Sequence, residues 1–409
     1  MNVSFLQRVD RYVGVPLCFC LTVARKIFGR QPPPGPALAR RILFVKLAEQ
    51  GSTVLAVPAI RRAIELAGRE NVYFVVFEDN RFILDLLELI PEQNVITIRA
   101  QGFLRMGASA WRAIRRLQQL KLDAVVDMEF FSRGSAAIAF LSGANARVGF
   151  HAFFGGGPYR GDLMTHRLSY NSRLHTTTTF RVLVEALNHD PAQLPVLDFA
   201  PPDTAFDMPA FVPKPGETES VEMMLPRSNG RRMPIILLNP NASDLLPLRQ
   251  WPREQYSQLA HRLLAELPEI QIVFTGAPEE AIEIGALVGQ INSARCVCLA
   301  GKTTLRQLMV LYTLSEVLVT NDSGPAHFAT LTPIHTVTLF GPETPALFGA
   351  PTSRNLPLWA GLSCSPCVNA YNNRQSTCRD NRCMKQITVN QVFDEVCRIF
   401  RQRIGSQSK

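Results

Sequence analysis

Short apolar runs alternate with helix-length amphipathic stretches along most of this chain, and they do so in two blocks. A strand that is apolar on both faces has to be covered on both faces, so this alternation predicts a parallel sheet between two layers of helices. The first block holds the runs RILFVKL, NVYFVVF, NVITIR, DAVVDM and RVGF, with helices expected over 53–67 and 107–120. The second holds PIILLN, EIQIVFTG, CVCLAG, EVLVTND and HTVTLFG, with a final helix expected over 388–403.

An irregular, proline-rich stretch from Pro191 to Pro234 separates the two blocks. Such a stretch is typical of a linker. We therefore predict an α/β protein of two doubly wound, Rossmann-like domains whose strand C-termini face a shared cleft. The predicted boundaries are 1–36 for a tail and proline-rich hinge, 37–200 for the first domain, 201–233 for the linker, 234–387 for the second domain, and 388–409 for a C-terminal helix and tail.

The first 41 residues carry most of the excess positive charge. Seven Lys and Arg residues face Asp10 alone, which gives this segment +6 of the formal net charge of +9. Its apolar run, 12–24, is shorter than the roughly 20 residues of a membrane-spanning helix. An apolar run flanked by arginines predicts a segment that associates with an anionic membrane surface, and the alternative is an ordinary helix packed on the protein. A nucleic-acid surface would spread its charge over a folded domain, so no nucleic acid is predicted as a partner.

Four of the nine cysteines follow the pattern C-x2-C-x10-C-x4-C. The first pair has the spacing of zinc ligands, and four thiolates would complete a tetrahedral structural site. The second pair is wider than usual, so free or redox-active thiols are the alternative, and a catalytic zinc is not predicted. The large chain needs no disulfide framework, which favours a reducing cytoplasm. The four residues are Cys364, Cys367, Cys378 and Cys383.

The stretch VLVTNDSGPAHFATL, residues 317–331, has the features of an anion site. An apolar strand is followed by a polar turn, and Pro325 stands in the first turn of the next helix, where no N–H is needed. Amides at the start of such a helix favour a phosphate. Asp322 and Ser323 either belong to this site or cap the helix. His327 either reaches a pyrophosphate or bonds to a neighbouring carbonyl.

The longer stretch VTNDSGPAHFATLTPIHTVTLFGPETPALFGAP resembles the signature of glycosyltransferase family 9, the bacterial lipopolysaccharide heptosyltransferases. Here Glu343 precedes Thr344 where the family has FGPT. LNPNASDLLPLRQWPREQYSQLA, FTGAPEE, RVGF and VKLAEQGSTVLAVPAI are also similar to the family, so the resemblance covers about residues 40 to 400. The family's DSGxxH turn and FG-P loop are matched by Asp322, Ser323, Gly324, His327, Gly341 and Pro342.

The resemblance implies a GT-B-type enzyme whose first domain binds the acceptor and whose second binds a nucleotide sugar. An arginine at 249 would bind phosphate oxygens and neutralise the leaving group. Gly276 would let the backbone approach the donor, and Glu279 or Glu280 would bind ribose hydroxyls unless both only interact with the helix dipole. No Asp-x-Asp pair occurs, so we predict transfer without a metal or other cofactor. The predicted donor-binding residues are Asn241, Ser243, Arg249, Gly276, Glu279, Glu280, Asp322, Ser323, Gly324, His327, Gly341 and Pro342.

The first loop departs from the family at the residue that the resemblance assigns as the catalytic base. The family has a glycine followed by an aspartate, and this chain has Gly51 and Ser52. A serine without an adjacent base is a poor proton acceptor, and we expect Ser52 to cap a helix beginning near Thr53. The candidate replacements are Glu49 in the same loop and Glu129 after the fourth strand, with Glu49 ranked slightly ahead.

These features predict an inverting glycosyltransferase. It would transfer heptose or a related sugar from a nucleotide-diphosphate donor, expected to be ADP-heptose, to a lipopolysaccharide-core or other lipid-linked glycan. It would work in the cytoplasm, held peripherally on the inner membrane by its tail. The alternative is a non-catalytic relative that binds nucleotide sugar or glycan in membrane glycan assembly, which Ser52 supports and the intact donor loops oppose. A sugar-nucleotide epimerase of the same shape would have no use for the tail.

Overall fold

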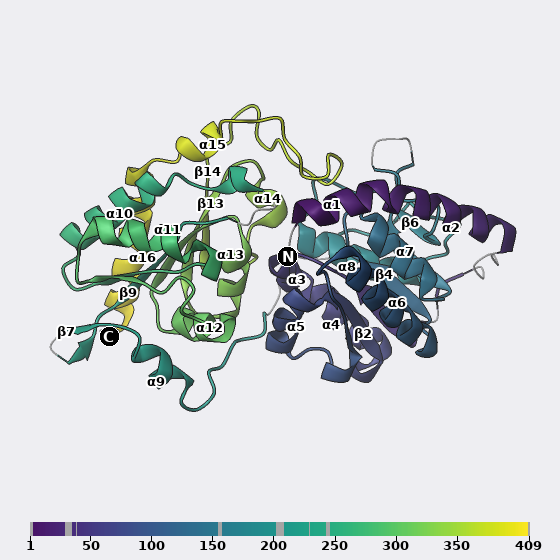
Figure 1. Ribbon diagram of the computed structural model, residues 1–409, viewed down its shortest axis with the longest axis horizontal. Helices are drawn as coiled ribbons and strands as arrows, with labels where there is room; N and C mark the ends of the chain where they lie inside the picture. Colours follow the sequence, from purple (N-terminus) through teal and green to yellow (C-terminus); the bar gives the residue numbers. More distant parts are fainter. Residues whose placement is uncertain are drawn as a thin grey trace. The chain divides into compact units, whose positions relative to one another are not determined.

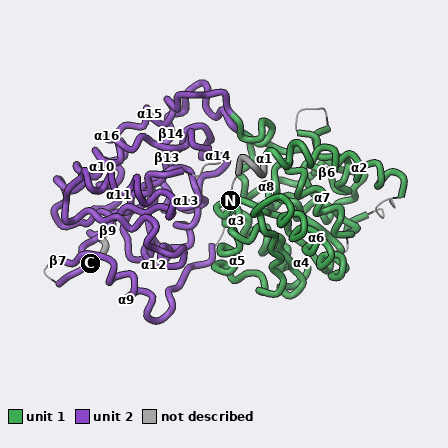
Figure 2. The backbone as a smooth tube through the Cα atoms, in the orientation of Figure 1, with its two compact units in different colours: residues 1–206, 369–375 green, residues 207–368, 376–409 purple. Residues whose placement is uncertain are grey.

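The computed structural model describes residues 3–28, 35–37, 39–153, 158–201, 208–228, 230–242 and 246–407. The chain divides into two compact units, coloured separately in Figure 2. Unit 1 consists of Met1–Phe206 and Asn369–Gln375, and unit 2 of Asp207–Val368 and Ser376–Lys409. Residues 369–375, called the late segment below, therefore belong to unit 1 although they follow most of unit 2 in the sequence.

Unit 1 is built on a six-stranded sheet in the order β3-β2-β1-β4-β5-β6, and every pair of neighbours is parallel. Figure 1 labels β2, β4 and β6 of this sheet. The order reverses between β1 and β4, so the carboxyl ends of these two strands lie side by side at the switch point of a doubly wound sheet. The five predicted strands are confirmed, and β6 is an addition whose sequence, HRL, has no apolar run. The strands are β1 (Ile42–Val45), β2 (Val72–Phe77), β3 (Val95–Ile98), β4 (Ala124–Asp127), β5 (Ala146–Phe150) and β6 (His166–Leu168).

The helix predicted over 53–67 is two helices, divided at Ala56. Pro58 explains the division, because a proline inside a continuous helix would remove a hydrogen bond and clash with the preceding turn, whereas it fits the first turn of a new helix. The helix predicted over 107–120 corresponds to α6. The helices of unit 1 are α1 (Val3–Tyr12), α2 (Gly14–Phe28), α3 (Gln50–Leu55), α4 (Val57–Ala67), α5 (Arg81–Leu87), α6 (Phe103–Gln119), α7 (Arg133–Leu141) and α8 (Thr176–Glu185).

The N-terminal tail forms α1 and α2, which belong to unit 1 and pack on the rest of it. Asp10 of α1 accepts hydrogen bonds from the backbone N–H groups of Arg133 (2.8 Å) and Gly134 (2.9 Å) at the start of α7. Cys18 of α2 is fully buried, and a Cβ on Gly14 would lie 2.8 Å from the Cβ of Arg133. The tail is therefore a pair of helices docked on the sheet's helical layer. Residues 31–34 of the predicted hinge lie outside the described residues.

Among the helices that the structure describes, none is both long enough and apolar enough to cross a membrane.

Unit 2 repeats the architecture with a parallel sheet in the order β11-β10-β9-β12-β13-β14. The five predicted strands and the final helix are confirmed, while β14 is an addition at the edge. The strands of the sheet are β9 (Ile235–Asn239), β10 (Gln271–Phe274), β11 (Cys296–Cys298), β12 (Val317–Asn321), β13 (His335–Phe340) and β14 (Asn355–Trp359), and a separate antiparallel pair is β7 (Arg227–Ser228) and β8 (Arg231–Arg232). The helices are α9 (Glu217–Glu222), α10 (Arg253–Glu266), α11 (Ala281–Ile291), α12 (Leu305–Thr313), α13 (Gly324–Phe328), α14 (Pro345–Phe348), α15 (Arg382–Lys385) and α16 (Val389–Gln407).

Candidate functional site

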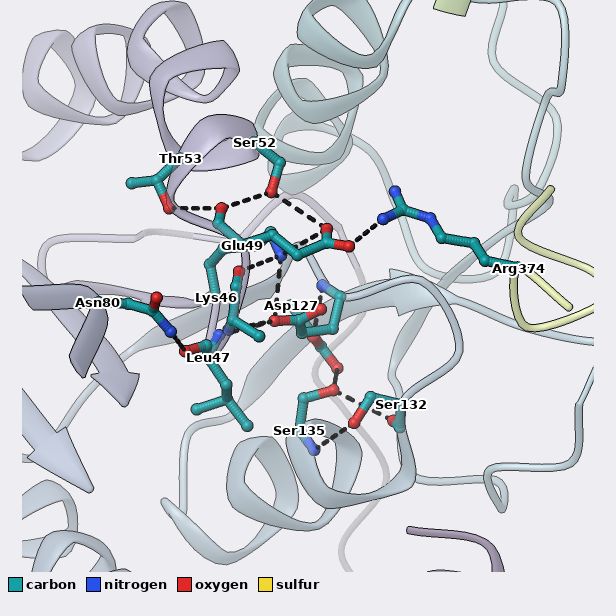
Figure 3. A network of polar contacts seen from close by, with 12 residues as sticks. Lys46, Leu47, Glu49, Ser52, Thr53, Asn80, Asp127, Ser132, Ser135 and Arg374 are labelled. Carbon is teal, nitrogen blue, oxygen red and sulfur yellow. Dashed lines mark hydrogen bonds and ion pairs between the residues drawn. The ribbon is translucent and has the colours of Figure 1, made fainter. Parts of the chain in front are cut away.

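A buried lysine joins the two carboxylates that the sequence offers as bases. Lys46 directly follows β1 and is fully buried, and its Nζ donates to the carbonyl of Ala48 at 2.7 Å. The same Nζ lies 3.2 Å from Glu129 Oε1. It also lies 3.5 Å from Glu49 Oε2 (Figure 3). A desolvated ammonium requires such partners, because an unpaired buried charge is strongly unfavourable. Lys46 could not be recognised from the sequence pattern, because it follows an apolar run and looks like part of the strand.

Glu129 holds the loop after β1. Its Oε1 accepts hydrogen bonds from the backbone N–H groups of Leu47 (2.7 Å) and Ala48 (3.1 Å), in addition to the contact with Lys46. Three donors therefore converge on one oxygen, and the side chain is only 13% exposed. This geometry favours a structural role for Glu129 over a role as proton acceptor.

Glu49 is the more accessible of the two carboxylates, with a side chain 24% exposed. Its backbone is left-handed, with φ of 66°, a conformation uncommon for residues other than glycine and often associated with functional sites. Its Oε2 accepts a hydrogen bond from Ser52 Oγ at 3.3 Å, and its Oε1 forms an ion pair with Arg374 of the late segment (Figure 3). Glu49 is thus surrounded by two cations and a hydroxyl.

Ser52 does not have the predicted capping role. Helix α3 begins at Gln50, so Ser52 lies inside its first turn and Glu49 occupies the N-cap position. The Ser52 hydroxyl donates instead to the Glu49 carbonyl at 2.8 Å and to the Glu49 carboxylate. The prediction is wrong because the helix starts three residues earlier than the sequence pattern indicates.

Asp127, at the end of β4, has the contacts of a structural residue. It is fully buried and pairs with Arg160, and it accepts hydrogen bonds from Ser135 Oγ (2.9 Å) and from the backbone N–H of Glu129 (3.0 Å). Burial raises the pKa of this carboxyl, and the charge of Arg160 opposes that shift. Through the Glu129 N–H, Asp127 also fixes the start of the loop that carries Glu129.

In unit 2, Arg249 lies between two buried carboxylates. Its Nη1 donates to the Asp322 carbonyl at 3.2 Å, its Nε lies 3.5 Å from Asp322 Oδ2, and its Nη2 lies 3.1 Å from Glu343 Oε2. In the sequence, Glu343 stands out only as a departure from the family, although its place directly after the FG-P loop was a signal. The guanidinium predicted to bind phosphate is therefore already paired.

Asn321 ties the end of β12 to the loop after β9. Its Nδ2 donates to the carbonyls of Pro240 (3.0 Å) and Asn241 (3.2 Å), and its Oδ1 accepts from the Trp251 N–H (3.0 Å). The predicted donor residue Asn241 is buried there, with its Oδ1 bonded to Gln250 Nε2 at 3.0 Å. Asn241 and Arg249 thus stand in one loop that is fastened to the DSG turn. The other donor residue predicted in this loop, Ser243, lies outside the described residues.

The DSG turn leads into α13, a helix of five residues with Pro325 in its first turn as predicted. Ser323 occupies the N-cap position, but its side chain makes no capping bond and its hydroxyl donates to the Asn321 carbonyl at 3.2 Å. Ser323 therefore does not take the capping role that was the alternative to a place in the anion site. Asp322 and His327 are both buried, and Gly324 begins the helix. Asp322 and Arg249 are brought together, as a shared donor site would require.

Gly276 and the acidic pair after it are explained by local packing. A Cβ on Gly276 would lie 2.8 Å from Glu280 Oε2, so packing within unit 2 already requires a glycine at this position. Glu280 Oε2 accepts a hydrogen bond from the Ala277 N–H at 2.7 Å, which matches the alternative of a purely local role. Glu279 is exposed on the surface.

Gly341 and Pro342 support the segment that carries the cysteines. A Cβ on Gly341 would lie 2.7 Å from Met384 Cγ and 3.2 Å from Cys383 Sγ, and the Pro342 carbonyl accepts a hydrogen bond from the Cys367 N–H at 3.0 Å. Only glycine allows this approach. The FG-P loop therefore positions the cysteine segment through direct contacts, and this role is separate from the predicted role in donor binding.

The four clustered cysteines are free thiols and neighbours. Burial raises the pKa of Cys383, and Cys367, Cys378 and Cys364 raise it further. Over the part of the chain that the structure describes, no group of three or more His, Cys, Asp or Glu side chains is arranged to hold a metal ion. In this arrangement the thiols do not form a metal site. The structural zinc stays a prediction, which metal analysis of the purified protein tests.

The architecture identifies a class of protein. Each unit has a six-stranded parallel sheet in the doubly wound order, and two such units form the GT-B fold of the heptosyltransferases. The model of glycosyltransferase family 9 (heptosyltransferase) matches residues 110–377, more than half of the chain, and the chain belongs to this family. The resemblance inferred from the DSG turn is thereby confirmed.

Individual relatives match over shorter stretches. The lipooligosaccharide heptosyltransferase 2 of Campylobacter jejuni is 30% identical over 173 residues, which are 41% of this chain and 51% of the relative. The lipopolysaccharide heptosyltransferase 2 of Salmonella typhimurium is 34% identical over 113 residues, 27% of this chain and 32% of the relative. The chain thus spans about half, or less, of the length of these curated relatives. The structure of the E. coli ADP-heptose LPS heptosyltransferase II covers 89% of this chain and 99% of its own, with a TM-score of 0.66 and 18% identity, a likeness of fold.

Proposed function

We propose that this protein is an inverting glycosyltransferase that transfers heptose, or a related sugar, from ADP-heptose to a lipopolysaccharide-core or other lipid-linked glycan. The observation that carries the proposal is the Glu49 carboxylate, partly exposed at the end of β1 and flanked by Lys46, Arg374 and Ser52. It stands in the loop where the family has its base. Family membership and the ADP-heptose enzyme of E. coli support the donor.

Glu49 would act as the general base. It accepts the proton of an acceptor hydroxyl while that oxygen attacks the anomeric carbon of the donor. The bond from this carbon to the nucleotide diphosphate breaks, the diphosphate leaves with the electron pair, and the configuration inverts. The nearby cations favour the ionised carboxylate, which is the form that accepts a proton. Glu129 holds the loop, and unit 2 binds the nucleotide.

Turnover with defined donors tests the proposal. The purified full-length protein is incubated with ADP-heptose or other nucleotide sugars and a membrane-lipid acceptor, and nucleotide release is measured. We expect acceptor-dependent release of ADP, and a loss of about 10²–10⁴-fold in kcat for Glu49→Gln, the usual contribution of a positioned base. Nucleotide binding without turnover of any donor would establish the alternative, a non-catalytic relative, which the serine at position 52 favours.

We also propose that α1 and α2 hold the protein on the cytoplasmic face of the inner membrane. One face of α2, with Cys18 and Thr22, packs on unit 1. The opposite face is apolar as well, since Phe19 is 60% exposed, Ile27 is 65% exposed and Val23 lies between them. A packed surface helix normally has a polar outer face, and an exposed apolar face marks an interaction surface. Anionic headgroups would complement the exposed basic residues of these helices, Arg8, Arg11 and Lys26, whereas Arg25 is paired with Asp162.

A further inference from the structure

The late segment brings a cation to the candidate base from far along the chain. Arg374 Nη1 forms a hydrogen-bonded ion pair with Glu49 Oε1, although the two residues are 325 positions apart (Figure 3). The Arg374 side chain is only 12% exposed. An ion pair shielded from water in this way is stronger than the usual surface pair, which contributes little. The contact is therefore more than a surface salt bridge.

The partners of Glu49 are divided between its two carboxylate oxygens. Arg374 contacts Oε1, whereas Ser52 Oγ (3.3 Å) and Lys46 Nζ (3.5 Å) contact Oε2. Contacts on both oxygens fix the direction of the carboxylate. A general base has to point at the proton that it removes from within hydrogen-bonding distance, so this orientation matters for its chemistry.

The late segment is anchored by contacts that do not involve Glu49. The Tyr371 hydroxyl donates to the Tyr170 carbonyl, and the Tyr371 ring centroid lies 5.4 Å from that of Tyr170 and 5.6 Å from that of Phe131. The guanidinium carbon of Arg374 lies 5.7 Å from the centroid of the Phe130 ring. Aromatic and cation–π contacts of this kind are directional. These contacts therefore hold Arg374 in position independently of its ion pair with Glu49.

We propose that Arg374 is a positioning residue for Glu49. Its charge keeps the Glu49 carboxylate ionised, and its contact with Oε1 fixes the direction in which the carboxylate points. Such support is needed because Glu49 has a longer side chain than the family's aspartate and stands three positions earlier in the loop. The proposal rests on the proposed function, since it assumes that Glu49 is the base. In this proposal the late segment completes the acceptor-side site of unit 1, because it supplies Arg374.

The pH dependence of kcat/KM distinguishes positioning from a structural role. Arg374→Gln removes the charge and keeps most of the length. We expect kcat to fall about 10–100-fold and the acidic limb of the pH profile to move up by about one pH unit, because the loss of an opposite charge disfavours the ionised carboxylate. KM for the nucleotide sugar should stay unchanged. The matched control is Arg382→Gln, which changes an exposed arginine of unit 2 that forms an ion pair with Asp380.

Two further variants test whether Arg374 acts through Glu49. Arg374→Lys retains the charge without the planar fork, so it should preserve the acidic limb and recover part of kcat, and it replaces the glutamine variant if that one misfolds. Glu49→Gln/Arg374→Gln should be no slower than Glu49→Gln alone, since residues that act as a unit are not additive. An unmoved acidic limb, or losses that multiply in the double variant, would overturn the proposal. Full turnover by Glu49→Gln alone would instead refute the base assignment.

Discussion

Glu343 Oε2 lies 3.1 Å from Arg249 Nη2, and Asp322 Oδ2 lies 3.5 Å from Nε of the same guanidinium. Two carboxylates therefore share one arginine in the buried part of unit 2, at the ends of β12 and β13. This arrangement gives the DSG turn and the FG-P loop a common partner. Arg249, Asp322 and Glu343 together carry a net negative charge when both carboxylates are ionised. The contacts of Arg249 with these carboxylates therefore hold the donor loops together, in addition to any contact with a diphosphate.

Removing Arg249 should destabilise unit 2. Arg249→Gln removes the cation that contacts both buried carboxylates, and breaking a buried pair in this way costs about 3–5 kcal/mol. Chemical denaturation followed by circular dichroism measures the loss. Adding Glu343→Gln to Arg249→Gln should restore part of the stability, because one buried charge disappears. If the single variant unfolds at the same denaturant concentration as the wild type, the pairing has no energetic weight.

Glu129→Gln separates loop support from catalysis. The amide oxygen still accepts from the N–H groups of Leu47 and Ala48, but the charge that faces Lys46 is lost. We expect a loss of about 1–3 kcal/mol of stability and a smaller fall in kcat than in Glu49→Gln, with ADP affinity unchanged. Steady-state kinetics and calorimetric ADP titration check both parts. A fall in kcat as large as that of Glu49→Gln, in a fully folded protein, would exchange the two roles.

His166 should make unit 1 less stable in mild acid. Burial lowers the pKa of this histidine from 6.5 to about 4, so the folded state binds a proton less readily than the unfolded state. The resulting stability is present above pH 6.5 and is lost as the pH falls toward 4. At pH 5 the loss is about 2 kcal/mol relative to pH 7. His166→Gln should show a smaller drop in melting temperature between pH 7 and pH 5 than the wild type, and an equal drop would contradict this origin.

The fold could be predicted because its central strands are apolar throughout. All four residues of β1 and all five of β9 are buried, so their sequences carry an unbroken signal. The edge strands β6 and β14 carry no such signal, since an edge strand needs less burial and can hold residues such as Pro357. The strand order then places the carboxyl ends of β1 and β4 side by side, as expected at the switch point of a doubly wound sheet.

The site could be predicted only in part. Glu49 was located from its position in the first loop, but its cation Arg374 could not be, because no local pattern links residues 325 positions apart. Lys46 could not be recognised because it adjoins the apolar run of β1. No sequence pattern indicates that Glu343 pairs with Arg249. The capping prediction for Ser52 is wrong, and the capping alternative for Ser323 is not realised. A serine near a helix start can bond to several backbone carbonyls, and both hydroxyls bond to such carbonyls here.

The outer face of α2 should bind anionic vesicles. We expect the full-length protein to float with vesicles that contain phosphatidylglycerol, and to do so less at high salt, because basic residues near the surface are screened. Phe19→Ser/Ile27→Ser should reduce the bound fraction tenfold or more, since each large apolar side chain contributes about 1.5–3 kcal/mol when buried. The matched control is Ile282→Ser, an exposed isoleucine of unit 2, which should leave binding unchanged. If the wild type stays in the soluble fraction with anionic vesicles, the apolar face of α2 serves another purpose and the membrane proposal fails.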